Sequence, residues 1–228
     1  MCNEFARRIS LDQLRAGWGA ADAKLLFSEA LPNMPALDSI RITDPAIILR
    51  AAQGEPGAAE IVTRRWSWPG AHGKPVYNFR SDGREFANGA TSGRCLIPAD
   101  GFYEFTDDIP LPLAGGARGG EPEPALTLFA EKNSPSRKRE GSKKAKFEFR
   151  IPGFDWFGIA GLWRTDPNVG EAWTMLTTAP GPDIAPYHDR QIVLLTPPDY
   201  ALWLDGSVPA ADLCRPLPAG TLEARRVR

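Results

Sequence analysis

The chain begins Met-Cys-Asn, and a cysteine in second position has chemistry that an internal cysteine lacks. If the preceding methionine is removed, Cys2 carries an α-amine and a thiol on neighbouring carbon atoms. The amine can attack an aldehyde to give a Schiff base, and the thiol can then close on the imine carbon to give a thiazolidine. Closure is intramolecular, so the effective concentration can reach about 10⁵ M or more. The α-amine has an ordinary pKa of about 7.7–8.0, so part of it is neutral at physiological pH.

Three further polar residues lie in apolar surroundings, where an unpaired polar group costs free energy. Asn78 lies in PVYNFRSDG, Glu104 in ADGFYEF and His188 in IAPYHDRQIVLL. Taken singly, each such residue is more often structural than catalytic. Taken together with Cys2, they fit one reaction. Glu104 would move protons on sugar hydroxyls, His188 would relay protons at the imine, and Asn78 would orient the nucleophile.

Strands must position most of these residues. β-branched and aromatic runs punctuated by Gly and Pro predict strands at IRITDPAIILRA, EIVTRRWSW, GRCLIPA, GFYEF, PALTLFAE, WFGIAGLW and EAWTMLTTA. Ser10 and Gln13 form a capping-box pattern, which predicts a short helix near 11–17. TPPDYALWLDG predicts a second helix, with Thr196 as N-cap, proline in the first turn and Gly206 at its end.

The predicted fold class is α+β. We expect a single compact domain over residues 1–228, with a β-rich, barrel-like and mostly antiparallel core, a few short helices and long loops. The 22 prolines and 22 glycines suit short strands joined by loops. Residues 107–124 and 133–146 lack hydrophobic periodicity, and we expect flexible loops there rather than domain linkers.

Composition excludes several classes of protein. A hydrophobic share of 43 % in 228 residues is enough for a sizeable core. No apolar run approaches the length of about 18 residues that a transmembrane helix needs, and the start has no signal-peptide pattern, so we expect a soluble, cytoplasmic protein. Cys2, Cys95 and Cys214 show no CxxC spacing, which argues against a disulfide framework and a zinc site. We expect no metal and no cofactor, and we expect Cys95 and Cys214 to be packing residues.

Charge is distributed unevenly along the chain. The formal net charge of −1 predicts no overall attraction to nucleic acid. Residues 136–150, SRKREGSKKAKFEFR, nevertheless hold seven basic against two acidic side chains. This stretch is either a solvated loop or an arm that attracts phosphates, and both alternatives stay open.

Several motifs occur together in one order: MCN at the start, NFRS, RCLIPADGFYEF, FGIAGLW, and LTTAP followed by HDR and an apolar strand. In these motifs the chain resembles the SRAP family of SOS-response-associated peptidases, or abasic-site processing proteins, over nearly its whole length. The resemblance implies a β-rich mixed fold with a basic cleft. It implies that Cys2 becomes the mature N-terminus and cross-links, through a thiazolidine, to the ring-opened aldehyde of an abasic site in single-stranded DNA. Asn78, Glu104 and His188 match the family's active-site asparagine, glutamate and histidine.

The same resemblance suggests where DNA would be contacted. Arg80 and Arg84 are the candidates for phosphate contacts, where a guanidinium can hold two oxygens. Trp66 and Trp68 lie where family members place an aromatic wedge, and stacking a base there would contribute roughly 1–3 kcal/mol. Either tryptophan fits a place in the core equally well.

The chain also departs from the family pattern. Asn3 and Glu4 stand where many members have Gly-Arg, and Asp82 and Gly83 stand where the family has Glu and Thr. The family's Asn-x-x-Pro ends here at Pro45, preceded by Thr-Asp. These departures concern the expected DNA contacts more than the chemistry of Cys2.

The function predicted from the resemblance is a sensor and shield of abasic sites in the DNA damage response. It would be an enzyme with cross-linking and lyase-like activity, acting reversibly, with autopeptidase removal of residues before Cys2. We expect single-stranded DNA containing abasic sites as the partner, no membrane, a monomer, and association with the nucleoid when bound to DNA.

Two alternatives stay open. One is an N-terminal nucleophile amidohydrolase, in which the Cys2 thiolate attacks an amide and its own amine acts as the base. The other is a non-catalytic single-stranded DNA binding domain, in which Cys2 is incidental.

Overall fold

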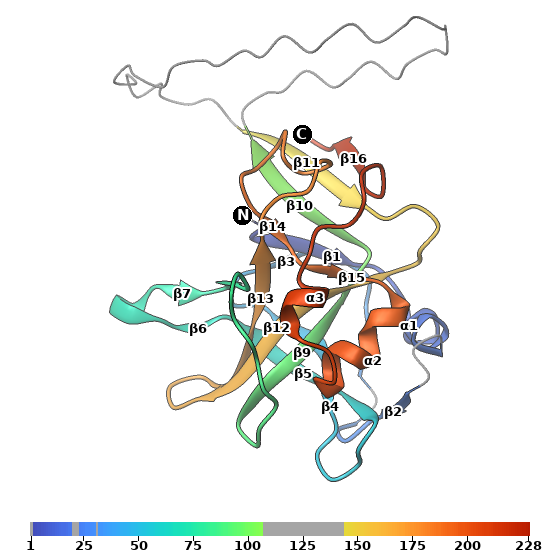
Figure 1. Cartoon of the computed structure of the whole chain (residues 1–228), viewed down its shortest axis with the longest axis vertical. Coiled ribbons are helices and arrows are strands. Elements are labelled where there is room, and N and C mark those ends of the chain that lie inside the picture. Colours follow the sequence, from blue (N-terminus) through green and yellow to red (C-terminus); the bar gives the residue numbers. More distant parts are fainter. Residues whose placement is uncertain (1, 20–22, 31, 107–143) are drawn as a thin grey trace, which may run out of the picture.

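The structure is a computed structural model that describes residues 2–19, 23–30, 32–106 and 144–228 (Figure 1). The predicted strand PALTLFAE and the predicted loops, up to residue 143, lie outside these residues. The elements in chain order are β1 (Glu4–Arg7), α1 (Leu11–Trp18), β2 (Lys24–Leu26), β3 (Leu37–Arg41), β4 (Pro45–Ala51), β5 (Ala58–Trp66), β6 (Trp68–Pro69), β7 (Pro75–Val76), β8 (Asn78–Arg80), β9 (Ser92–Ala99), β10 (Gly101–Thr106), β11 (Ala145–Arg150), β12 (Phe157–Asp166), β13 (Gly170–Thr178), β14 (Gln191–Ile192), β15 (Leu194–Leu195), α2 (Pro197–Asp205), α3 (Ala210–Leu213) and β16 (Glu223–Arg226).

Five strands close into a barrel. β13, β12, β9, β4 and β5 pair in this order, each antiparallel to the next. A parallel pairing of β5 with β13, which sets Trp66 opposite Trp173, closes the ring. β13 continues past its pairing with β5 and there pairs in parallel with β8. The residues of β8 therefore lie at the edge of the barrel.

A second, antiparallel sheet has the strand order β16-β11-β10-β1-β3. β9 of the barrel continues into β10 of this sheet with only Asp100 between them, so one stretch of chain serves both sheets. The Asp100 carboxylate accepts bonds from the main chain and side chain of Arg8 and from Arg150, which fixes the bend. Figure 1 shows β10, β11 and β16 at the end of the molecule where both chain ends lie.

The predicted fold class is confirmed, because the described residues form a β-rich, mostly antiparallel barrel with few and short helices. α1 has the predicted capping box, with the Gln13 N–H donating to Ser10 Oγ and the Ser10 N–H donating to Gln13 Oε1. α2 begins after Thr196 and ends at Gly206, whose left-handed φ of 75° terminates the helix. Over the described parts of the chain, no helix has the length and apolar character needed to cross a membrane.

Two predicted strands are each divided in two. IRITDPAIILRA becomes β3 and β4, separated by a turn in which Thr43 has a φ of 81°. EIVTRRWSW divides at Ser67, where a φ of 78° ends β5 and turns the chain into β6. A run of β-forming residues does not reveal such left-handed single residues, because neither Thr nor Ser is typical of that conformation.

Trp66 lies at the centre of the barrel core. Its side chain is fully buried, its ring stacks on Trp173 at 5.3 Å and meets Phe5 edge-on at 5.5 Å, and its indole N–H donates to the Tyr77 carbonyl at 3.0 Å. Because removal leaves a large cavity, we expect Trp66→Ala to lower the free energy of unfolding by about 3–5 kcal/mol. Urea denaturation measures this, with the exposed Phe154→Ala as control. A loss no larger than that of the control would contradict the assignment of Trp66 to the core.

Candidate active site

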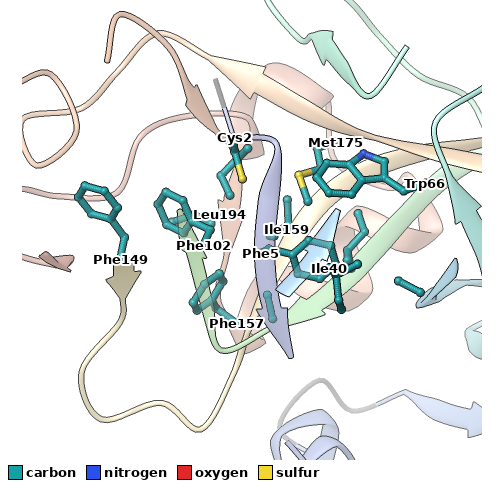
Figure 2. Packing of buried hydrophobic residues seen from close by; sticks show 14 of the residues in the cluster. Cys2, Phe5, Ile40, Trp66, Phe102, Phe149, Phe157, Ile159, Met175 and Leu194 are labelled. Carbon is teal, nitrogen blue, oxygen red and sulfur yellow. The ribbon is translucent and has the colours of Figure 1, made fainter. Parts of the chain in front are cut away.

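Cys2 lies immediately before β1, at the border of the apolar core. Its side chain is fully buried, and Sγ donates to the Glu4 carbonyl at 3.2 Å. Figure 2 shows Cys2 beside Leu194 and Phe102. Burial, and next the negative charge of Glu104, raise the pKa of the Cys2 thiol to about 12. At neutral pH this cysteine is therefore a thiol and not a thiolate.

Glu104 is a carboxyl group of β10 that the fold removes from water. Its side chain is 1 % exposed, and burial raises its pKa to about 7. The backbone N–H of Cys2 donates to this carboxyl group. If the residue before Cys2 is removed, the nitrogen at the Glu104 carboxyl becomes an α-amine. A carboxyl group with a pKa near the working pH can both give and take protons at that nitrogen.

Asn78 holds Cys2 from the barrel side. It is the first residue of β8, opposite Met175 of β13, and its Nδ2 donates to the Cys2 carbonyl at 2.9 Å. Asn78 Oδ1 is buried and has no hydrogen-bond partner among the described residues. The Asn78 side chain thus holds the Cys2 main chain through Nδ2, and its Oδ1 can accept a hydrogen bond at the same place.

His188 lies on a turn before β14, and its N–H donates to the Ile184 carbonyl at 3.0 Å. Burial lowers its pKa, which favours the neutral ring. In that form Nδ1 accepts from the Arg190 N–H at 3.0 Å, so the ring proton is on Nε2. Asp189 Oδ1 lies 2.7 Å from the same Nδ1 and can accept a bond only when Nδ1 carries a proton.

The His188 turn faces the sheet that carries Glu104. The ring of Tyr187 packs edge-on against Phe147 at 4.8 Å, and Phe147 is the cross-strand partner of Glu104. The charge of Asp189 is one of the influences that raise the pKa of Glu104. The structure therefore gathers the four residues predicted to be catalytic at the border between the barrel and the second sheet.

The residues predicted to contact DNA fall into two groups. Arg80 and Arg84 are exposed, on and just after the strand that begins with Asn78, and the Arg84 guanidinium lies 4.8 Å from the ring centre of Phe79. Trp66 has no exposed face on which a base could stack, so its place in the core corrects the wedge interpretation. Trp68 is 6 % exposed, with the Arg164 guanidinium 4.5 Å from its ring centre.

The sequence did not reveal which residues pair with the buried Glu4 carboxylate, two residues after Cys2. Lys146 Nζ and Ser39 Oγ donate to Glu4 Oε1 at 2.8 and 2.6 Å. Burial opposes ionisation of Glu4, but these two bonds prevail and lower its pKa. Lys146 lies 142 residues further along the chain, so no local pattern could reveal the pair. Lys146 belongs to β11, although the sequence placed it at the end of a loop.

A cavity of about 350 Å³ opens beside this pair. It is lined by Asn3, Glu4, Arg41, Ile42, Phe105, Lys146 and Arg228. Because three of these residues are basic and one is acidic, the cavity offers a polar, cationic approach to the chain next to Cys2.

The model of the SRAP family, SOS response associated peptidase, matches residues 129–228, less than half of the chain. The matched part includes the motifs FGIAGLW, LTTAP and HDR, and for this part it confirms the resemblance that the motifs indicated. No curated protein matches the chain.

Solved structures resemble the whole chain. A protein from Bordetella bronchiseptica has a TM-score of 0.65 at 22 % identity, with all of both chains covered. A phage-related protein from the same organism has 0.63 at 18 %, covering all of this chain and 94 % of its own. A protein from Bacteroides thetaiotaomicron has 0.61 at 15 %, covering all of this chain and 92 % of its own. At such identities the likeness establishes the fold.

Proposed function

We propose, starting from the match of residues 129–228 to the SRAP family, that this protein cross-links reversibly to abasic sites in single-stranded DNA through Cys2 and so shields the lesion. One observation carries the proposal: the Cys2 nitrogen lies at the buried carboxyl group of Glu104 while Asn78 holds the Cys2 carbonyl. Removal of the preceding residue would place a reactive amine at a group suited to proton transfer.

The first step is Schiff-base formation. Glu104 assists opening of the deoxyribose ring by taking the proton of the C1′ hydroxyl and returning a proton to the ring oxygen, which exposes an aldehyde. The Cys2 amine attacks C1′, a nitrogen–carbon bond forms, and water leaves. His188 relays protons as the carbinolamine collapses, and the neutral ring that its lowered pKa favours suits this role.

The second step is closure to the thiazolidine. Cys2 Sγ adds to the imine carbon, the sulfur–carbon bond forms, and the thiol proton ends on the amine nitrogen. No oxidant or reductant is required. Because burial raises the pKa of the Cys2 thiol to about 12, the thiol must lose its proton as it attacks.

DNA would approach along the exposed arginines. Arg80 and Arg84 extend the site on the side of Asn78, where guanidinium groups can hold backbone phosphates. The cationic cavity at Arg41, Lys146 and Arg228 adds positive charge on the side of Asn3.

The direct test mixes the purified protein with single-stranded DNA in which a uracil has been excised. We expect a heat-stable adduct on a denaturing gel, and none with the uracil-containing strand before excision. Salt-sensitive binding to both strands without an adduct would instead support a non-catalytic domain, and turnover of glutamine or another amide would support an amidohydrolase.

A further inference from the structure

A buried carboxylate organises the cations that lie just beyond Cys2. Glu4 is 4 % exposed, and its Oε1 accepts from Lys146 Nζ at 2.8 Å and from Ser39 Oγ at 2.6 Å. The Ser39 hydroxyl in turn accepts from Arg41 Nε at 3.1 Å. Arg41 is also the cross-strand partner of Glu4, between β3 and β1. One carboxylate thus fixes an ammonium group directly and a guanidinium group through a hydroxyl.

Most hydrogen-bond donors of these two cations remain available to a ligand. An ammonium group has three donors and a guanidinium group has five. Over the described part of the chain, Lys146 Nζ gives one hydrogen bond, to Glu4, and the Arg41 guanidinium gives one, through Nε. Arg41 Nη2 lies 3.8 Å from Glu4 Oε1, which is too far for a hydrogen bond, and the Arg41 side chain is 70 % exposed.

These donors border the cavity of about 350 Å³ described above. Arg228 adds a third cation to its lining, and the Arg228 carbonyl accepts from the Lys146 N–H at 3.1 Å. Glu4 is the one carboxylate among the described lining residues, and its charge is already paired with Lys146, so positive charge is in excess. Asn3 lines the cavity and directly follows Cys2. An anion held in the cavity would therefore lie beside the residue that carries the chemistry.

We propose, on the basis of the proposed function, that this cavity is an anion subsite that holds a backbone phosphate of the bound single-stranded DNA. A DNA strand linked to Cys2 has to continue past Asn3, and it carries a negative charge at every nucleotide. Arg41 can hold two oxygens of one phosphate, and Lys146 adds a point charge. Glu4 holds the two cations in place and does not contact the phosphate itself.

The first test compares Arg41→Met with Arg15→Met, which removes an exposed arginine of α1, an element that Figure 1 shows away from the N-terminus. The Kd for undamaged single-stranded DNA is measured between about 0.05 and about 0.3 M salt. For Arg41→Met we expect a salt slope reduced by about 0.7 and binding weakened by about fivefold at about 0.1 M salt. Arg15→Met should leave both values nearly unchanged. Equal effects of the two substitutions would overturn the subsite.

A scan of neutral linkages identifies the phosphate itself. Methylphosphonate replaces the phosphates of the strand one at a time, and each strand is bound to the wild-type protein and to Arg41→Met. At one linkage we expect the wild-type protein to lose about fivefold in affinity and Arg41→Met to lose almost nothing further, because the contact is already absent. Additive losses at every linkage would contradict a direct contact with Arg41.

A charge-neutral change separates the subsite from general attraction. Glu4→Gln combined with Lys146→Met removes one charge of each sign, so general electrostatics predicts unchanged binding. The subsite predicts a salt slope reduced by about 0.7. A slope like that of the wild-type protein would overturn the role of Lys146.

The same measurements distinguish the subsite from the proposed function, because they need no adduct. A wild-type protein that forms no adduct but shows the Arg41 effects would count against the proposed function alone. A normal adduct together with an Arg41→Met variant that behaves like Arg15→Met would overturn the subsite alone. A wild-type protein that does not bind single-stranded DNA would overturn both.

Discussion

Glu104→Gln is expected to slow adduct formation by about 10²–10⁴-fold, the usual contribution of a general acid–base group. The glutamine side chain is nearly isosteric with that of Glu104 and can still accept the Cys2 N–H bond, but it cannot transfer protons. The wild-type rate should titrate with a group of pKa about 7, and this part of the pH profile should vanish in the variant. Single-turnover rates between about pH 5.5 and about pH 8.5, on both sides of this transition, measure both effects.

The same substitution is expected to stabilise the protein. The pKa of Glu104 rises from 4.5 to about 7 in the folded protein, so the folded state binds the proton more tightly and loses stability as pH rises through this range. Above pH 7 the loss approaches about 3 kcal/mol, and Glu104→Gln should recover much of it. Glu4→Gln is the matched control with the opposite sign, because the pKa of Glu4 is lowered and its ionised form stabilises the fold above its unfolded pKa. Equal losses in urea denaturation of both variants would show that Glu104 is only structural.

Cys2→Ala should abolish the heat-stable adduct, with a loss of at least about 10²-fold, because the thiol that closes the ring in an intramolecular step is gone. The variant keeps an α-amine at Glu104, so it should still form a Schiff base that borohydride traps and heating hydrolyses. Gel analysis with and without borohydride separates the two species.

Cys214→Ala provides the control for loss of a buried thiol, because Cys214 is 8 % exposed and lies far from Cys2 in the sequence. Its adduct should match that of the wild-type protein. A heat-stable adduct on Cys2→Ala would assign the linkage to another group and would refute the thiazolidine mechanism.

The elements whose ends are marked locally could be predicted from the sequence. α1 begins at the Ser10–Gln13 capping box and α2 ends at Gly206, because these side chains and this glycine act within a few residues of themselves. β9, β10 and β12 follow from β-branched and aromatic runs. The pairing of β5 with β13, which closes the barrel, could not be predicted from the sequence, because a parallel pair of distant strands has no local signature.

The residues of the candidate site divide in the same way, into those with a local signal in the sequence and those that depend on distant segments. The chemistry of Cys2 is apparent from its position, and Glu104 is conspicuous as a carboxyl group among aromatic residues. Whether a tryptophan faces DNA or the core depends on the facing strand, and for Trp66 that strand carries Trp173. The links from Lys146 to Glu4 and from Arg190 to Asp82 also join distant segments, so they became visible only in the folded chain.

The most direct test of the account compares protein that begins at Cys2 with protein that keeps Met1, prepared from cells in which methionine aminopeptidase is inhibited. Intact mass identifies the N-terminus of each, and both are mixed with the abasic strand. We predict a heat-stable adduct only on chains that begin at Cys2, with nearly equal affinity of the two proteins for undamaged single-stranded DNA. An equal yield of heat-stable adduct on chains that retain Met1 would contradict the account, since the acylated Cys2 nitrogen cannot form the imine on which the Cys2 thiol closes.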